Sequence, residues 1–411
     1  MSARNLYLIA TASWFLAFGM QAVVFAWLVT IVLHEPAQLV GWAQTALLAP
    51  GMLLMLISGA LADRLGTDRQ ALLAQMMAAI IPWILIAALQ QGWLDFSVMI
   101  IYALLMGIAQ TFVTPARDGL LNHIAEGKVQ RMVLLTSLTQ FSCQIVGNSL
   151  AAFADTWGAT VILMLQSGFL SVGVIAYALI SRSGVAKPEQ SKTNLLHGLL
   201  EGAGTVWRSP VMRNILVQNV AMALFFMGCF IVCFPLAVRD VFNGSANDLA
   251  LLNALNGLGL ALTIVVLLRL GYVRRAGRAL LLSQGLGALA LGASGFVGVF
   301  PAFVLLIFVW GMCGGMAMPM SRTLMQELAP PAQRARVMSF YAFSFMGAGP
   351  LGTLFCGYLA ASIGPQNAII VCATMMLCVS VVMRFATGLW QFDFEKERVN
   401  MPESAGASEQ A

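Results

Sequence analysis

A series of apolar runs, each about 20 residues or longer and separated by short polar segments, constrains this chain more than any other feature. About 20 apolar residues in a helix span the hydrocarbon core of a bilayer, because each residue adds about 1.5 Å. Of the 411 residues, 60% are hydrophobic and only 9% are charged, whereas a soluble domain carries about 25% charged residues. The sequence therefore predicts an all-α polytopic membrane protein and excludes a soluble domain of this length.

The apolar runs predict twelve transmembrane helices in two sets of six. The expected spans are 5–33, 38–61, 70–90, 96–116, 132–154, 159–181, 213–238, 248–268, 278–297, 302–322, 336–361 and 366–388. The chain enters its first apolar run at once, which favours a retained helix over a cleaved signal peptide.

Four units follow from these spans. Residues 1–181 are expected to form an N-terminal six-helix bundle and residues 213–388 a C-terminal one. The linker 182–212 carries leucines, Val206 and Trp207 on one helical face, which predicts an amphipathic helix on the cytoplasmic membrane surface. The tail 389–411 is polar, and we expect it to be disordered.

Lysine and arginine residues are distributed very unevenly between the predicted loops. With the spans placed as above, 21 of the 22 basic residues lie on one side of the membrane, and Arg239 alone lies on the other. Basic residues in short loops favour the cytoplasmic side, so we expect both termini to be cytoplasmic. The net charge of +5 is spread over many loops, so it does not indicate a nucleic-acid partner.

The two halves of the chain share short sequence motifs. The run Gly107–Pro115 resembles Gly311–Pro319, 204 positions later, and Arg64–Gly66 recurs as Arg269–Gly271, 205 positions later. Nearly equal offsets at matching loop positions predict two parallel, similar six-helix halves.

A charged turn between the second and third spans carries the most specific motif. Gly59, Asp63, Arg64, Gly66 and Arg69 follow the pattern G-x-x-x-D-R-x-G with a basic residue after it. This turn resembles the corresponding loop of the major facilitator superfamily. The resemblance implies the major facilitator fold, with this turn as a conformational latch between the halves of a transporter. The family usually has two or three basic residues after the last glycine, whereas here Arg69 is the one base and an extra acid precedes it.

The linker carries a second resemblance. The runs Gly198–Gly202 and Trp207–Arg213 are similar to the connector in the branch that contains macrolide-efflux proteins and the enterobactin exporter. This resemblance implies a multi-pass transporter of the bacterial cytoplasmic (inner) membrane that exports a small molecule by alternating access in exchange for protons. The sequence shows no cofactor-binding motif and no G-x-x-x-x-G-K-[ST] loop for ATP, and we expect a monomer.

Neutral polar and aromatic residues are the candidates for a substrate cavity. In the superfamily, helices 1, 4, 7 and 10 line this cavity, and no acidic or basic residue lies at mid-depth in any expected span. The cavity candidates are Trp14, Gln21, Phe25, Gln110, Thr114, Gln140, Gln144, Gln218 and Met316. Packing between helices is the alternative role for each, and it is favoured for Gln140, Gln144 and Met316. Such a lining suits a neutral or amphipathic organic compound.

Proline and glycine residues are candidate hinges. Gly349, Pro350 and Gly352 resemble the Gly-Pro motif that drug antiporters place on helix 5, here found on helix 11. Pro115 and Pro319 lie near the ends of the fourth and tenth spans. A proline frees a backbone carbonyl and permits a kink used in rocking, while plain helix packing is the equal alternative.

Residues for proton coupling, metals and disulfides are not evident. The acids nearest the pathway are Asp63, Glu35, Asp95 and Asp155, all at the edges of spans. The seven cysteines lie inside apolar runs, so we expect no disulfide, and Cys229 with Cys233 is interpreted as packing rather than a metal site.

An uptake permease and a membrane enzyme are the two alternatives to an exporter. An uptake permease of the same fold differs from an exporter in no residue that we can identify. A polytopic membrane enzyme needs a clustered nucleophile, acid–base pair or metal site, and the sequence shows none. We therefore expect a transporter that is not an enzyme.

Overall fold

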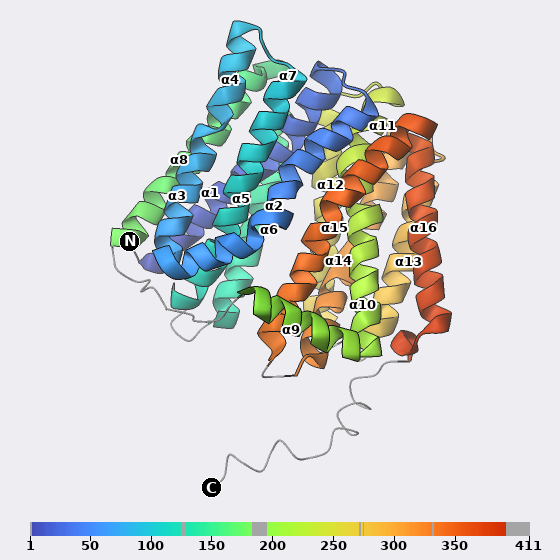
Figure 1. Cartoon of the computed structure of the whole chain (residues 1–411). Helices are drawn as coiled ribbons and strands as arrows, with labels where there is room; N and C mark the ends of the chain where they lie inside the picture. The colour runs from blue at the N-terminus through green and yellow to red at the C-terminus, as the bar shows by residue number, and fades with distance from the viewer. Residues whose placement is uncertain are drawn as a thin grey trace.

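The computed structural model describes residues 2–124, 129–182, 195–270, 273, 275–330 and 333–391, and every regular element in this part of the chain is helical. Figure 1 shows long, roughly parallel helices. In the first half they are α1 (Ala3–Trp27) with the π-helix η1 (Leu28–Val32), α2 (Ala37–Leu65), α3 (Thr67–Ile80), α4 (Pro82–Gln91), α5 (Phe96–Ile124), α6 (Val129–Ala151), α7 (Ala154–Trp157) and α8 (Ala159–Arg182).

The second half repeats this plan after the helix α9 (Leu195–Arg208). Its helices are α10 (Pro210–Ala221), the π-helices η2 (Met222–Met227) and η3 (Cys229–Cys233), α11 (Phe234–Asp240), α12 (Ala246–Leu270), α13 (Ala276–Ser294), α14 (Phe300–Leu328), α15 (Arg334–Ile363), α16 (Pro365–Ala386) and the short 3-10 helix η5 (Gly388–Trp390).

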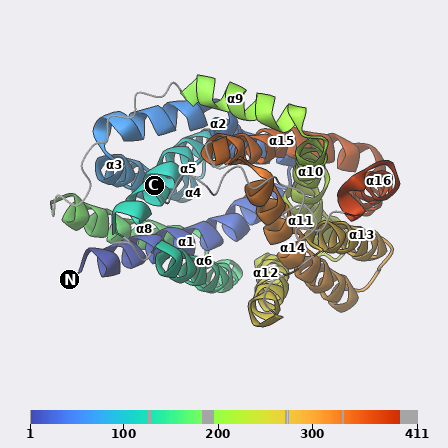
Figure 2. The same cartoon turned by 90° about the horizontal axis from the view of Figure 1, so that it is seen from below.

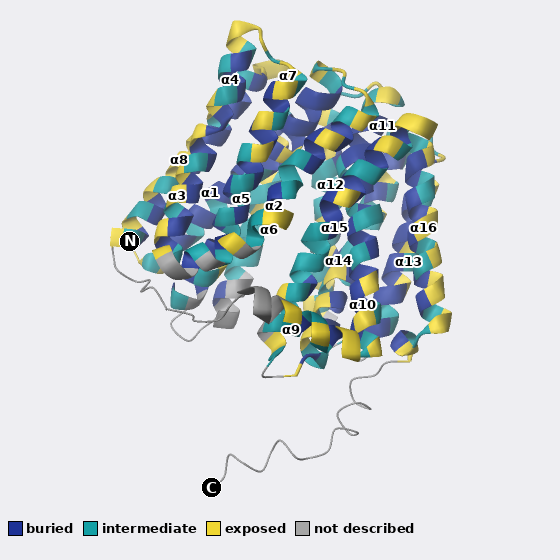
Figure 3. Ribbon diagram, in the orientation of Figure 1, coloured by how far each residue is buried: buried dark blue, intermediate teal, exposed yellow. Residues whose placement is uncertain are grey.

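The helices lie where the apolar runs predicted them. Within the described residues, nine helical stretches are long and apolar enough to cross a membrane. The long helices α2, α6 and α13 occupy the positions of the second, fifth and ninth expected spans. Large apolar side chains such as Phe296 and Phe385 are more than three-quarters exposed, as expected of a surface that lipid covers. Figure 3 shows exposed residues along outer helices such as α3, α8 and α16.

Two helices run further than predicted. The expected spans ended at residues 116 and 322, but α5 continues to Ile124 and α14 to Leu328, with Pro115 and Pro319 inside the helices. A proline in a membrane helix is tolerated where neighbouring groups satisfy the freed backbone, so it does not mark the helix end here.

The same tight helix crossing occurs in both halves. A Cβ on Gly147 of α6 would lie less than 3.0 Å from the carbonyl oxygen of Leu16 in α1. A Cβ on Gly352 of α15 would lie equally close to the carbonyl oxygen of Leu224 in η2. The two glycines are 205 positions apart, the offset of the sequence repeat. Each crossing needs glycine because the backbones touch, and Figures 1 and 2 show the helices α1–α8 and α10–α16 as two groups.

The turn after α2 depends on Gly66, whose φ of +90° lies in a region that favours glycine. Next to it, the buried Gln70 donates from Nε2 to the carbonyl oxygens of Ser58 and Phe112, both at 3.0 Å. Gln70 therefore ties α2, α3 and α5 together. Gly59 is half-buried and Arg69 is exposed, whereas the side chains of Asp63 and Arg64 lie outside the described residues.

The linker helix α9 packs on the end of α15, and Figure 2 shows it running along one edge of the molecule toward α10. Thr205 Oγ1 donates to Gln333 Oε1 at 2.6 Å, and Glu201 forms an ion pair with Arg336. Val206 is fully buried, while Trp207 on the same predicted face is 66% exposed. On the predicted apolar face, Val206 therefore packs against the protein, whereas Trp207 is left exposed.

The start of the predicted tail is ordered, which corrects the prediction of disorder from residue 389 onward. Leu389 is fully buried, and the guanidinium carbon of Arg384 lies 3.8 Å from the centroid of the Trp390 ring. Arg278 Nε donates to the carbonyl oxygen of Trp390 at 3.0 Å. Residues 392–411 lie outside the described part of the chain.

The predicted cysteine pair belongs to a larger thiol cluster. Cys229 and Cys233 are fully buried in η3 and contact Cys372 and Cys356, respectively. The Sγ atoms of Cys356 and Cys372 are 3.6 Å apart. The four thiols fill the space between η3, α15 and α16 as small, polarisable packing groups.

Candidate functional site

A cavity of about 450 Å³ lies between the two halves. The first half lines it from α1, α2, α5 and α6, and the second half from η2, η3, α11, α12, α13, α14 and α15. Its volume is within the range of pockets that hold small organic ligands, about 300–1,000 Å³. A site shared between two halves changes shape whenever the halves move relative to one another.

Carboxamide side chains supply most of the polar groups of the lining. They come from both halves: Gln21, Gln44, Gln110, Gln144 and Asn148 from the first, and Asn253, Asn256 and Gln284 from the second. The tight α1–α6 crossing brings α6 against α1, since a Cβ on Gly19 would meet the backbone of Gln144 and Asn148. This crossing places the amides of α6 beside Gln21.

Four aromatic rings form the apolar wall contributed by the second half. Trp310 of α14 lies against Phe226, Phe230 and Phe234, with ring centroids 5.6, 5.7 and 5.6 Å apart. The three phenylalanines are four residues apart along η2, η3 and α11, so they share one face of the seventh span. Phe226 and Phe234 meet Trp310 edge to face, at 84° and 71°, while the Phe230 ring is tilted by 37°. Aromatic pairs at these distances attract one another, which makes this wall a stable apolar surface.

Among the residues that the structure describes, no Asp, Glu, Lys, Arg or His lines the cavity. An ionised ligand in such an environment loses hydration without gaining a counter-charge. A neutral or amphipathic ligand loses much less, because amides satisfy its hydrogen bonds and aromatic rings cover its apolar part.

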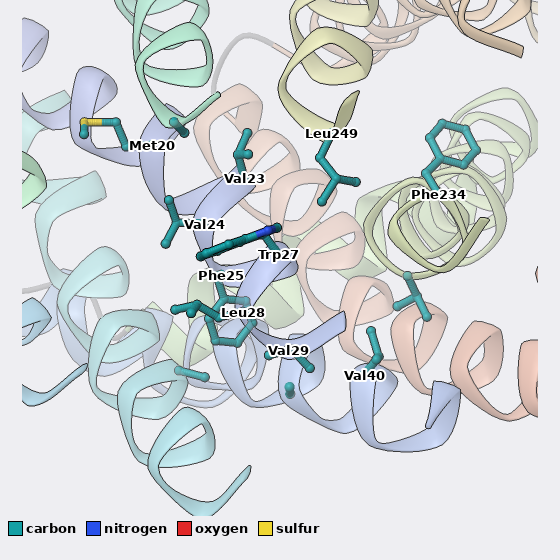
Figure 4. Close-up of a cluster of buried hydrophobic side chains, with 14 of the residues drawn as sticks. Met20, Val23, Val24, Phe25, Trp27, Leu28, Val29, Val40, Phe234 and Leu249 are labelled. Carbon is teal, nitrogen blue, oxygen red and sulfur yellow. The ribbon is translucent and has the colours of Figure 1, made fainter. Parts of the chain in front are cut away.

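Apolar side chains close the cavity at the end where α1 finishes and α2 begins. Trp27, Val29 and Val40 of the first half and Phe234 and Leu249 of the second belong to one buried cluster. Figure 4 shows these side chains gathered around the end of α1. All five are at most 9% exposed, so this end is sealed by packing.

Hydrogen bonds between the halves reinforce the same end. Thr45 Oγ1 of α2 is 2.7 Å from Thr353 Oγ1 of α15 and donates to the carbonyl oxygen of Pro350 at 3.2 Å. A Cβ on Gly41 would lie 2.9 Å from the Cα of Gly357. The predicted hinge residue Pro350 is therefore at the contact between the halves, where its carbonyl accepts a bond from the opposite half.

Charged side chains add two further links. Arg239 at the end of α11 donates from Nη1 to the carbonyl oxygens of Thr30 (3.2 Å) and Glu35 (2.6 Å) in the first half. Asp155 of α7 accepts from the backbone N–H of Ala246 at 2.8 Å, at the N-terminus of α12, where the helix dipole favours a negative charge. The described hydrogen bonds between the halves all lie at this end.

The structure brings four of the nine predicted cavity residues together. Gln21, Phe25, Gln110 and Gln144 line the cavity. The other five do not line it: Trp14, Thr114, Gln140, Gln218 and Met316. Trp14 and Gln218 are buried within their own halves, and Thr114 Oγ1 donates to the carbonyl oxygen of Gln110 in its own helix.

The predicted hinge residues also lie in different surroundings. A Cβ on Gly352 would clash with the carbonyl oxygen of Leu224, whereas a Cβ on Gly349 would meet the Met227 side chain at 3.5 Å. Gly352 is therefore at a close helix crossing, whereas Gly349 is at an ordinary van der Waals contact. Pro115 and Pro319 are half-buried inside α5 and α14.

Several lining residues were missed. Gln44 lies on the second span, and Gln284 on the ninth, neither of which the resemblance marks as a cavity helix. Phe226, Phe230 and Trp310 belong to marked helices. The spacing of phenylalanines by four residues in the seventh span was the signal that could have found the aromatic wall.

Two similar groups of membrane-length helices around a shared cavity, closed at one end, define the architecture of a membrane transporter. A family model described as transmembrane secretion effector matches residues 3–407. The chain belongs to this family of the major facilitator superfamily, and it is a multi-pass membrane transporter rather than an enzyme.

Relatives of similar length extend the comparison. The chain is 26% identical over 391 residues to the multidrug efflux pump Tap of Mycolicibacterium fortuitum, covering 91% of this chain and 93% of that one. It is 24% identical over 347 residues to the uncharacterized MFS-type transporter YfiS of Bacillus subtilis (strain 168), covering 81% of each.

Solved structures show the same fold. A crystal structure of a mutant of the nucleoside transporter NupG matches with a TM-score of 0.76 at 13% identity, covering 93% of this chain and 99% of that one. A POT family transporter in complex with a thioalcohol-conjugated peptide matches with a TM-score of 0.72 at 13% identity, covering 92% and 94%. The prediction of the major facilitator fold is confirmed.

Proposed function

We propose that this transporter exports a small neutral or amphipathic organic compound by alternating access. The observation that carries the proposal is the uncharged cavity, lined by carboxamides and by the Phe226–Trp310 aromatic wall and shared between the halves. The similarity to a multidrug efflux pump along nearly the whole chain supports export of this class of compound. The site acts by exposing its two walls to one side of the membrane at a time.

The direction of opening follows from the proposed orientation. The distribution of basic residues favours a cytoplasmic linker and cytoplasmic termini in a bacterial inner membrane. The sealed end, which contains Arg239 and Asp155, then faces outward. The structure therefore corresponds to the state that receives substrate from the cytoplasm or the inner leaflet. The Asp63 turn lies at the opposite end, where a latch between the halves would act on closing.

Protons are the proposed coupling ion, and a monomer is the proposed unit. Because no carboxylate lines the cavity in the part of the chain that the structure describes, protonation would act at the ends of the pathway rather than on the bound substrate. The acids available there include Asp155, which joins the halves, and Asp63 in the charged turn.

Transport in everted membrane vesicles tests the proposal. We expect ATP-independent, protonophore-sensitive accumulation of a neutral amphipathic dye such as Nile red. Phe230→Ala removes one ring of the aromatic wall, and an aromatic contact contributes about 0.5–1.5 kcal/mol beyond its area, so the apparent affinity should fall by about 10-fold once area is included. The matched control is Phe296→Ala, whose ring is 77% exposed on the outer surface.

The outcomes separate export from uptake. Accumulation in everted vesicles that Phe230→Ala impairs and Phe296→Ala does not would support export through this cavity. Accumulation only in right-side-out vesicles would instead indicate an uptake permease. Equal transport by both variants would refute the cavity as the binding site.

A further inference from the structure

A buried arginine lies in the first half, away from the cavity. Arg117, near the end of α5, is only 7% exposed and is not part of the cavity lining. Leu6, Leu120 and Ile180 of α1, α5 and α8 belong to a buried apolar cluster that also contains Tyr7 and Tyr177. A guanidinium is always charged and costs several kcal/mol to bury unless it is paired and fully hydrogen-bonded.

The described residues balance this charge only partly. Nε and Nη2 of Arg117 both reach a single oxygen, Oδ1 of Asp118, at 3.4 Å, and the Asp118 side chain is 64% exposed. The guanidinium carbon also lies 4.8 Å from the centroid of the Phe15 ring. Nη1 is buried and has no hydrogen-bond partner in the protein.

Three hydroxyl groups in the same region are also buried without a hydrogen bond of normal geometry. Within the described residues, the hydroxyls of Tyr7, Thr11 and Tyr177 are buried and form no hydrogen bond of normal geometry, although the Tyr7 hydroxyl lies near those of Thr11 and Thr136. Tyr7 and Tyr177 are both fully buried, and both phenols lie close enough to Arg117 and Asp118 to feel their charges. The α1–α5–α8 junction therefore gathers four unsatisfied groups that can donate hydrogen bonds.

Buried polar groups are almost always satisfied, so a group of four without partners indicates a bound species. Water would satisfy the hydroxyls but would leave the guanidinium with only the long contact to the exposed Asp118 carboxylate as a counter-charge. An anion satisfies both requirements, because all four groups donate and one of them is a cation. A lipid phosphate on its glycerol backbone cannot reach groups with no exposed surface, so the ligand must be small and free.

We infer that Arg117, Tyr7, Thr11 and Tyr177 bind a small inorganic anion of the size of chloride, which joins α1, α5 and α8 at the linker end of the first half. This anion is separate from the substrate, since none of the four residues lines the cavity. The site therefore stands or fails independently of the proposed export function. An anion here fixes the three helices against one another while the halves rock as rigid units.

Anion-dependent stability of the purified protein in lipid-free detergent tests the site. At constant ionic strength, replacing gluconate with chloride should raise the thermal unfolding midpoint by about 1–3 °C, because a ligand that binds only the folded state stabilises it. Equilibrium binding of radiolabelled chloride should approach one ion per protein.

Two variants and a control make the test specific. Arg117→Met fills the same apolar space without the charge and should abolish both the shift and the bound chloride. Tyr177→Phe removes one donor and should weaken chloride affinity by about 10- to 150-fold, as expected for a hydrogen bond to a charged group. The control Arg213→Met removes an exposed cation and should change neither. An equal midpoint in chloride and gluconate, or a shift that persists in Arg117→Met, would overturn the inference and assign water to these groups.

Discussion

Replacing Arg239 with methionine should loosen the sealed end of the transporter. The side chain is only 12% exposed, and it is the one basic residue on its predicted side of the membrane. Its Nη1 bonds to the carbonyl oxygens of Thr30 and Glu35, so it crosses from the second half to the end of α1. Methionine keeps the length and the apolar stem but cannot donate a hydrogen bond.

The expected change in the ratio of sealed to open states follows from these contacts. A hydrogen bond to a charged group contributes about 1.5–3 kcal/mol. The bond to Glu35 is short, at 2.6 Å, and the bond to Thr30, at 3.2 Å, is near the long limit, so we count them together as one such contribution. Both carbonyls can bond to water once the end opens, which limits the loss. The ratio of sealed to open states should therefore fall by about 10- to 150-fold.

Cysteine accessibility measures this ratio. Ala22 lines the cavity and is replaced by cysteine in a background where Cys313, which also lines it, and the exposed Cys378 are serines. A membrane-impermeant maleimide is added to right-side-out vesicles. The labelling rate should rise with Arg239→Met by the factor above and should not change with Arg213→Met. If both variants label at the parental rate, Arg239 does not hold this end closed.

Three further substitutions test the turn and the helix crossings. Gln70→Leu removes the two side-chain hydrogen bonds by which this amide joins α3 to α2 and α5 and should lower the unfolding free energy by about 1–3 kcal/mol in total, measured by thermal or denaturant unfolding in detergent. Gly352→Val places a Cβ against Leu224 and should reduce folded yield sharply, whereas Gly285→Val, at a site with open space, should not; equal yields would contradict the crossing argument. Asp63→Asn should impair transport while expression and membrane insertion stay normal, and wild-type transport by this variant would remove the latch assignment.

Features that depend on membrane solvation could be predicted from the sequence. Lipid requires long apolar helices, and their ends fall where polar loops begin, so the element positions follow from hydropathy. Gly66 was identified by its place in a tight turn and does adopt a positive φ. The matching crossings at Gly147 and Gly352 keep the offset of the sequence repeat, although the sequence alone did not mark these two glycines as equivalent.

The cavity was harder to predict because a membrane helix is apolar on all sides. Phe226 and Phe230 line the cavity, while Phe296 faces outward, and the four-residue spacing of the phenylalanines in the seventh span is the one local feature that distinguishes them. Carboxamide side chains indicated the cavity better than aromatic ones did, because carboxamides avoid lipid. Even so, Gln70 donates its amide N–H groups within its own half, whereas Gln21 lines the cavity. Only the packing of the helices separates these two outcomes.

The division of the cavity between the halves gives a physical basis for coupling substrate to motion. Gln21 and Gln144 belong to the first half, and the ring cluster around Trp310 belongs to the second. A ligand that contacts both walls binds more tightly when they are close together, so it lowers the free energy of states in which the halves approach around it. At one end, the seal formed by Thr45, Arg239 and their partners already holds the halves together. In the proposed export cycle, substrate binding therefore favours approach of the halves at the opposite end, where the Asp63 turn lies. The seal must then open for the substrate to be released.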